Sequence, residues 1–134
     1  MSEPLRSGTL DVRVRYTECD PMGVVHHTVY PVWFEMGRTE LLRETGVSYR
    51  SLEEEGVRLA VIDLQVTYRR PARYDDLLTL TTTLLDSGRV KVRHDYALHR
   101  DGTLLVTGCT TLACLDSQGR IQPIPEIIRQ PAHR

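Results

Sequence analysis

Residues 30–44 have the sequence YPVWFEMGRTELLRE, which predicts one long amphipathic helix. Its apolar residues are spaced three and four apart and form a single stripe: Tyr30, Trp33, Phe34, Gly37 and Leu41. We expect Thr28 to cap the first turn, where Pro31 is tolerated, and Gly46 to end the helix. A helix with one apolar stripe is not stable alone, so it must pack against a second apolar surface.

The rest of the chain supplies that surface as strands. Alternating apolar and polar residues predict strands at 10–16, 57–68, 77–85, 90–99 and 103–115, and short helices are expected at 48–55 and 123–130. Tight turns at Ser87-Gly88 and Asp101-Gly102 make the strands that they join antiparallel neighbours. The sequence therefore predicts an α+β fold in which an antiparallel sheet wraps around one long central helix.

The chain of 134 residues is expected to form a single domain at 9–130, with a flexible leader at 1–8 and a tail at 131–134. A formal charge of -1 gives no basic field for nucleic acid. No apolar run approaches the roughly 20 residues that a membrane helix needs, so we expect no membrane span. Three cysteines without a metal-ligand spacing, and no apolar signal segment, predict a cytoplasmic protein with reduced thiols.

Residues 17–29 have neither a helical nor a strand period and form the loop before the long helix. Asp20 lies in this loop, and the free amides at the helix start, near His27 to Tyr30, favour a charged carboxylate. The same amides could stabilise the negative oxygen that develops in acyl transfer. Gly23 would let the backbone approach a ligand closely. However, an Asp before a proline is often only a turn or cap residue, and the local pattern leaves that reading open.

The adjacent histidines His26 and His27 are candidates for a general acid or base. Neighbouring residues point in different directions on most backbones, and no further ligand completes a metal set, so we expect no metal site. Cys19 lies beside Asp20, whose charge would raise the thiol pKa, and we interpret it as an unreactive thiol.

Residues 16–30, YTECDPMGVVHHTVY, resemble the 4-hydroxybenzoyl-CoA thioesterase family, with Phe34-Glu35 and residues 38–43 extending the likeness. The second matching segment is 66–76, VTYRRPARYDD, and the likeness covers nearly the whole chain. Within the family the chain is most similar to the short-chain acyl-CoA thioesterases of the Tol–Pal-associated branch.

The resemblance implies a hotdog fold, a homodimer or homotetramer, and hydrolysis of an acyl-CoA without a cofactor, since coenzyme A is part of the substrate. In this family the carboxylate matching Asp20 attacks the thioester carbonyl or activates water. The backbone amide matching His27 polarises the carbonyl oxygen as the oxyanion hole. The chain departs from the family at Val29, where asparagine commonly precedes the tyrosine, and this places the helix cap on Thr28.

The substrate is expected to contact Gly23, His26, Thr28 and Tyr30, and its phosphates to bind basic residues that include Arg69, Arg89 and Lys91. Each basic residue has an alternative role as part of the solvated face of the sheet. Two other functions stay open at this point. One is a hotdog dehydratase with a histidine base, and the other is a non-catalytic acyl-thioester binding protein.

Overall fold

The computed structural model describes residues 4–129 and contains one five-stranded antiparallel sheet in the order β1-β3-β4-β5-β2. The strands are β1 (Pro4–Arg13), β2 (Arg58–Tyr68), β3 (Leu77–Leu85), β4 (Lys91–Arg100) and β5 (Thr103–Leu115). The helices are α1 (Val29–Arg43), α2 (Tyr49–Glu54) and α3 (Glu126–Arg129), and a 3-10 turn, η1, spans Tyr16–Glu18. Within these residues no helix is long and apolar enough to cross a membrane.

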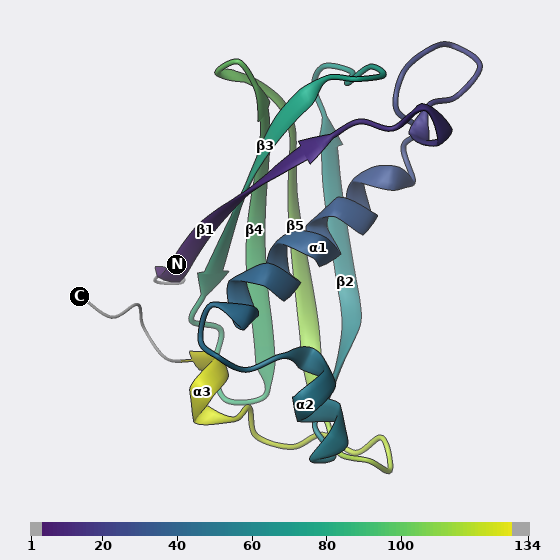
Figure 1. Cartoon of the computed structure of the whole chain (residues 1–134). Coiled ribbons are helices and arrows are strands. Elements are labelled where there is room, and N and C mark those ends of the chain that lie inside the picture. The colour runs from purple at the N-terminus through teal and green to yellow at the C-terminus, as the bar shows by residue number, and fades with distance from the viewer. Residues whose placement is uncertain (1–3, 130–134) are drawn as a thin grey trace.

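Helix α1 lies diagonally across the concave face of the sheet, which curves around it (Figure 1). The predicted apolar stripe is buried against the strands, together with Leu42. The predicted hairpins pair β3 with β4 and β4 with β5, both antiparallel. The long helix, its buried face and the wrapped sheet predicted from the sequence are therefore confirmed.

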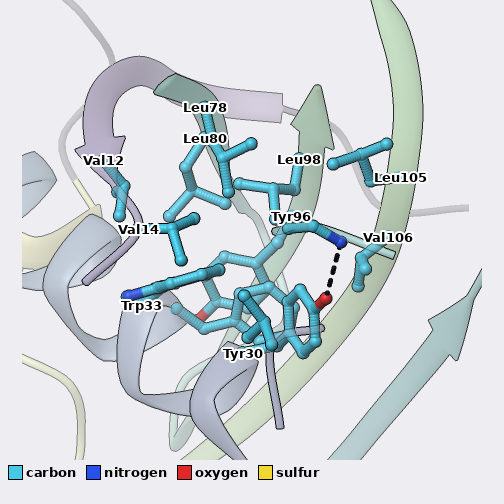
Figure 2. Packing of buried hydrophobic residues seen from close by; sticks show 13 residues of the cluster. Val12, Val14, Tyr30, Trp33, Leu78, Leu80, Tyr96, Leu98, Leu105 and Val106 are labelled. Carbon is cyan, nitrogen blue, oxygen red and sulfur yellow. Dashed lines mark hydrogen bonds between the residues drawn. The ribbon is translucent and has the colours of Figure 1, made fainter. Parts of the chain in front are cut away.

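Two glycines let α1 approach the sheet closely. A Cβ on Gly37 would lie 2.7 Å from Leu80 Cδ2 and would overlap Thr82 Oγ1. On β5, a Cβ on Gly108 would lie 2.6 Å from the Phe34 ring. The Phe34 ring instead stacks on Tyr96 at a centroid distance of 4.2 Å and an interplanar angle of 8°. Both rings belong to the buried cluster, in which Figure 2 shows Tyr96 beside Tyr30 and Val106.

The register aligns one row of apolar residues across all five strands. The row consists of Leu10, Leu80, Leu98, Val106 and Tyr68, each paired with the next. Because paired residues in a sheet share a face, this row places the last residue of β2 on the same face as α1.

The N-terminal strand begins six residues earlier than the predicted Leu10. Residues 4–8 belong to β1, so the predicted flexible leader is wrong for this part of the chain, and residues 1–3 lie outside the described region. Polar residues such as Ser7 and Gly8 pair with β3 through their backbones, which needs no apolar side chains. The strand also ends at Arg13, so Tyr16 lies in η1 instead. The predicted tail at 131–134 lies outside the described residues.

The edge strand β2 leaves large apolar side chains exposed. Val61 is 48% exposed, Ile62 54% and Leu64 44%. Both edges expose two charged residues, Arg58 and Asp63 on β2 and Asp11 and Arg13 on β1, but β1 exposes no large apolar side chain. The two edges of the sheet therefore differ in chemistry, and only β2 presents an apolar surface beside its unpaired backbone groups.

His94 is a buried histidine on the inner face of β4, 3% exposed, between Leu84 and Thr110 on the adjacent strands. Its Nδ1 has no hydrogen-bond partner among the described residues. Burial, aided by the charges of Arg38 and Arg6, lowers the pKa of His94 to about 3. The folded protein therefore keeps this imidazole neutral.

This buried imidazole predicts a loss of stability in mild acid. Below pH ~6.5 the unfolded chain takes up a proton that the folded chain does not bind. The free energy of unfolding should therefore fall as the pH drops from about 6.5 toward 3, and by pH 4.5 His94 alone should have cost about 2–3 kcal/mol. In His94→Leu this part of the slope should vanish. Urea titrations at several pH values measure it, with His99→Leu on the same strand as the control. Equal slopes in His94→Leu and wild type would contradict the assignment.

Candidate active site

The loop between η1 and α1 is closed by its own backbone. Cys19 and Val25 form an antiparallel bridge, and Asp20 N donates to Val24 O at 2.8 Å. Gly23 N donates to Asp20 O at 2.9 Å, which closes a turn, and Gly23 has a φ of +81°, a value that favours glycine. Few backbone rotations in this loop remain free, so the position of Asp20 is set by the fold.

The two carboxylate oxygens of Asp20 have different surroundings. Oδ1 accepts a hydrogen bond from Met22 N at 2.9 Å, which is the turn contact that the local pattern predicts. Within residues 4–129, Oδ2 has no hydrogen-bond partner, and Asp20 lines an open cleft. The turn role and the active-site role are therefore compatible, because one oxygen orients the group while the other remains available.

The backbone amide of His27 is free where its neighbours are occupied. His26 N donates to Glu18 O at 2.9 Å, Thr28 N to His26 Nδ1 at 3.3 Å, and Val29 N to His26 O at 3.0 Å. Among the hydrogen bonds of the described chain, none uses His27 N. A free N–H just before α1, at the positive end of the helix dipole, can donate to a developing oxyanion.

The predicted cap of α1 differs from the structure. Thr28 occupies the position before the helix, but its side chain makes no capping hydrogen bond. Its Oγ1 lies 2.7 Å from His26 Nδ1 instead. Because Thr28 N also donates to that nitrogen, both contacts are satisfied when His26 Nδ1 carries no proton and accepts. The His26 ring therefore holds the helix start, and its Nδ1 is not available as a general base.

Glu18 anchors the loop and was missed as a site residue from the sequence. Its carboxylate is 6% exposed and accepts from Arg15 N at 2.7 Å, and also from Trp33 Nε1 at 3.1 Å. It also pairs with the Arg15 guanidinium at 3.3 Å. A buried carboxylate with these donors ties the end of β1 to α1. No periodic pattern marks such a residue, because its partner Trp33 lies 15 residues away on α1.

A cleft of about 340 Å³ opens between this loop and the end of β2. It is lined by Asp20, Val24, Val25, His27, Tyr30, Tyr68, Arg69, Arg70 and Pro71. Tyr68 Oη donates to His27 O at 2.9 Å, and Tyr30 Oη accepts from Ala72 N at 3.4 Å. Burial is the main cause that raises the pKa of Tyr30, so this phenol stays protonated.

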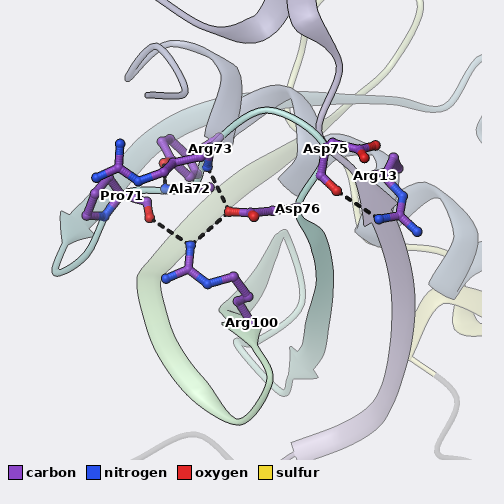
Figure 3. Close-up of polar contacts among 8 residues, drawn as sticks. Arg13, Pro71, Ala72, Arg73, Asp75, Asp76 and Arg100 are labelled. Carbon is purple, nitrogen blue, oxygen red and sulfur yellow. Dashed lines mark hydrogen bonds and ion pairs between the residues drawn. The ribbon is translucent and has the colours of Figure 1, made fainter. Parts of the chain in front are cut away.

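The far wall of the cleft is held by an ion pair. Asp76 Oδ2 accepts from Arg100 Nη1 and from Arg73 N, each at 2.8 Å (Figure 3). The same Nη1 donates to Pro71 O at 3.2 Å. Burial pushes the pKa of Asp76 up, but the hydrogen bonds from Arg73 N and Arg100 outweigh it and leave the pKa below its ordinary value. This pair fixes the segment whose Ala72 O accepts from Val25 N at 2.8 Å.

The structure separates the predicted substrate-binding residues into two groups. Tyr30 and Arg69 line the cleft together with the predicted catalytic residues Asp20 and His27, and Gly23, His26 and Thr28 belong to the adjacent loop. Arg89 and Lys91 lie at the β3–β4 hairpin, where Arg89 O accepts from Ile124 N near α3. That hairpin is at the opposite end of the sheet (Figure 1), so within one chain these two residues do not reach the cleft. Among the described residues, no group of three or more His, Cys, Asp or Glu could hold a metal ion.

Comparisons with known proteins identify the family and the fold. Residues 14–131 match the family described as the Thioesterase-like superfamily. The acyl-CoA thioester hydrolase YbgC of Escherichia coli O6:H1 is 35% identical over 106 residues, covering 78% of this chain and 79% of that protein. The acyl-CoA thioesterase YbgC of Haemophilus influenzae is 31% identical over 125 residues, 91% of each chain. Protein TT1821 of Thermus thermophilus has a TM-score of 0.86 at 35% identity, covering 92% of this chain and 93% of that one. The predicted family and hotdog fold are confirmed.

The ion pair between Asp76 and Arg100 should contribute to the stability of the fold. Asp76→Asn should lower the free energy of unfolding by about 1–3 kcal/mol at pH 7, because it removes a charge-assisted acceptor. Since the folded pKa of Asp76 is depressed, its contribution is complete above pH ~4 and is lost as the pH falls through the lower folded value. The gap between variant and wild type in urea titrations should therefore narrow below pH ~4. Asp101→Asn, in an exposed turn, is the matched control. A gap that stays constant down to pH ~2.5 would contradict the ion-pair account.

Proposed function

The chain belongs to the Thioesterase-like superfamily, and we propose that it is an acyl-CoA thioesterase that hydrolyses its substrate to a free acid and coenzyme A. The observation that carries this proposal is that Asp20 and His27 line the same cleft, and that Asp20 Oδ2 and His27 N have no hydrogen-bond partner among residues 4–129. Acyl transfer needs both a group that attacks or activates and a donor for the carbonyl oxygen. The names of the two YbgC relatives support the same reaction and the same class of substrate.

In the proposed mechanism, the thioester carbonyl lies in the cleft with its oxygen toward His27 N. Negative charge that develops on this oxygen is stabilised by the amide and by the positive end of α1. Asp20 Oδ2 then attacks the carbonyl carbon, or takes a proton from a water that does so. The tetrahedral intermediate collapses, the C–S bond breaks, and coenzyme A leaves as a thiolate that takes up a proton.

Direct attack by Asp20 and attack by an activated water both require Asp20. They differ in which molecule receives the oxygen of the water. Attack by Asp20 gives an acyl–aspartyl anhydride, and water then cleaves it. In a single turnover in ¹⁸O-water, only this covalent route can leave label in the aspartate. Mass spectrometry of the peptide that contains Asp20 therefore separates the routes.

The mouth of the cleft carries positive charge suited to phosphates. Arg69 and Arg70 both line the cleft and are exposed, and neither takes part in an ion pair within the described chain. Guanidinium groups form paired hydrogen bonds with phosphate oxygens. We assign Arg69 and Arg70 to the anionic end of coenzyme A, while Arg89 and Lys91 have no route to it from the same chain.

The decisive test is Asp20→Asn, which keeps the shape of the side chain and its Oδ1 contact but removes the charge. We expect the rate of thiol release to fall at least ~10²-fold, because the attacking or activating group is lost. Release is measured with a thiol reagent against acyl-CoAs of varied chain length and aromaticity. Asp101→Asn should retain wild-type rates. Wild-type turnover by Asp20→Asn would exclude the role of Asp20, and a wild type that hydrolyses none of the panel would exclude the function.

We also propose that β2 forms the interface of a homodimer, alone or within a tetramer. Its exposed apolar side chains and edge position are suited to pairing with a second copy, whereas β1 exposes no large apolar side chain.

Lysine on an edge strand opposes pairing, so Leu64→Lys should convert a dimer into a monomer. Light scattering coupled to size-exclusion chromatography measures the mass of both proteins. Thr9→Lys places the same charge on the β1 edge and should leave the dimer intact. A monomeric wild type, or a dimer that survives Leu64→Lys, would contradict the assignment of this edge.

A further inference from the structure

Tyr68 is the last residue of β2 and lies at the border between the sheet and the active-site cleft. Its pairing with Val106 turns the side chain to the face that carries α1. The ring packs edge-on against Tyr30, with centroids 5.4 Å apart and an interplanar angle of 68°. Tyr68 is 49% exposed, so the core does not require its hydroxyl.

The hydroxyl of Tyr68 makes a long-range contact with the backbone next to the free amide. Oη donates to His27 O at 2.9 Å, across 41 residues of sequence. This is a normal length for a hydrogen bond between a hydroxyl and a carbonyl. The packing against Tyr30 fixes the direction from which the hydroxyl approaches His27 O. The hydrogen bond therefore constrains the backbone at His27.

The peptide planes on both sides of His27 are held by different elements. The plane before it is fixed where His26 O accepts from Val29 N at 3.0 Å, a bond that belongs to the helix start. The plane after it is held at its carbonyl by Tyr68, which belongs to the sheet, and at its amide by the bond from Thr28 N to His26 Nδ1 at 3.3 Å. His27 N–H lies in the first of these planes, and the φ and ψ rotations of His27 couple that plane to the second. A shift of the His27 carbonyl can therefore tilt the amide.

We propose that Tyr68 is a positioning residue for the oxyanion hole, which it holds in place through the carbonyl of His27. The proposal rests on the proposed thioesterase function. Tyr68 acts on the reaction through the backbone and not through contact with the reacting atoms. Its effect should appear in the transition state, where the carbonyl oxygen carries most charge, rather than in the binding of the uncharged thioester.

The test is Tyr68→Phe, which keeps the ring and its packing on Tyr30 but removes the donor. Losing an oxyanion donor outright costs about 10²–10³ in kcat. Tyr68→Phe leaves the His27 amide in place but less firmly oriented, so its loss in kcat should be smaller. We expect kcat to fall about 10-fold or more, with KM within about threefold of wild type. Tyr74→Phe is the matched control, because Tyr74 is also exposed, at 57%, and its hydroxyl has no hydrogen-bond partner within residues 4–129.

A spectroscopic measurement separates positioning from a general loss of structure. In the Asp20→Asn background, the acyl-CoA that wild type hydrolyses fastest is bound with ¹³C at its thioester carbonyl, and isotope-edited infrared spectra report the C=O stretch. A well-placed amide polarises the carbonyl and lowers this frequency. Adding Tyr68→Phe should return the frequency toward its value in solution, whereas adding Tyr74→Phe should leave it unchanged.

The outcomes discriminate between the two proposals. If wild type hydrolyses acyl-CoAs and Tyr68→Phe has the same kcat, the positioning role is excluded and the thioesterase function stands. If Tyr68→Phe raises KM alone, Tyr68 contacts the substrate directly and the positioning role is also excluded. A lower kcat with an unchanged carbonyl frequency excludes it as well. If wild type hydrolyses no acyl-CoA of the panel, the proposed thioesterase function itself is excluded.

Discussion

The close contact of α1 with the sheet at Gly37 and Gly108 determines the geometry of the rest of the molecule. Neither position leaves room for a Cβ, because Leu80 and the Phe34 ring already occupy that space. Overpacking such a contact typically costs about 1–3 kcal/mol, and it would lift the helix away from the strands. With the helix seated and the Phe34 ring stacked on Tyr96, the height and direction of α1 are fixed. Its first residue is therefore brought to the end of the sheet where β1 stops and β2 ends (Figure 1).

The candidate site lies between the start of α1 and the end of the sheet. On one side, Glu18 ties the loop to α1 through Trp33, and on the other the segment after β2 is fixed by Asp76 and Arg100. The loop contributes only short-range bonds of its own, such as Asp20 N to Val24 O. Electrostatic stabilisation of a transition state is most effective when the donors are oriented before the reaction begins. The fold provides that orientation through neutral and charged hydrogen bonds that involve no substrate.

The sequence predicted the features that depend on local periodicity and missed those that join distant segments. The stripe from Tyr30 to Leu41 and the turn at Asp101-Gly102 were predictable, because each is encoded within a few residues. The contact of Tyr68 with His27 spans 41 residues and that of Arg100 with Asp76 spans 24, so the sequence around these residues does not predict them.

The errors have physical causes of the same kind. Thr28 has a side chain suited to an N-cap, but its backbone is already helical and its hydroxyl contacts His26 instead. The preference of threonine for cap positions does not predict either feature. The concentration of basic residues in the second half of the chain favours Arg89 and Lys91 as phosphate ligands. Whether a cation reaches the cleft depends on the end of the sheet at which it lies, and that requires the antiparallel pairing of β2 with β5, two strands that no hairpin joins.

The position of the cleft also relates the proposed interface to the proposed chemistry. Tyr68 ends the same strand whose exposed Leu64 marks the apolar edge, so the cleft begins where that edge finishes. A second copy paired along β2 would cover the edge and remove water from the neighbouring wall of the cleft. The attraction between a developing oxyanion and an amide grows as the surrounding dielectric falls. Pairing of the edge strands would therefore strengthen the interaction at His27, and the proposed interface would then have a catalytic consequence besides assembly.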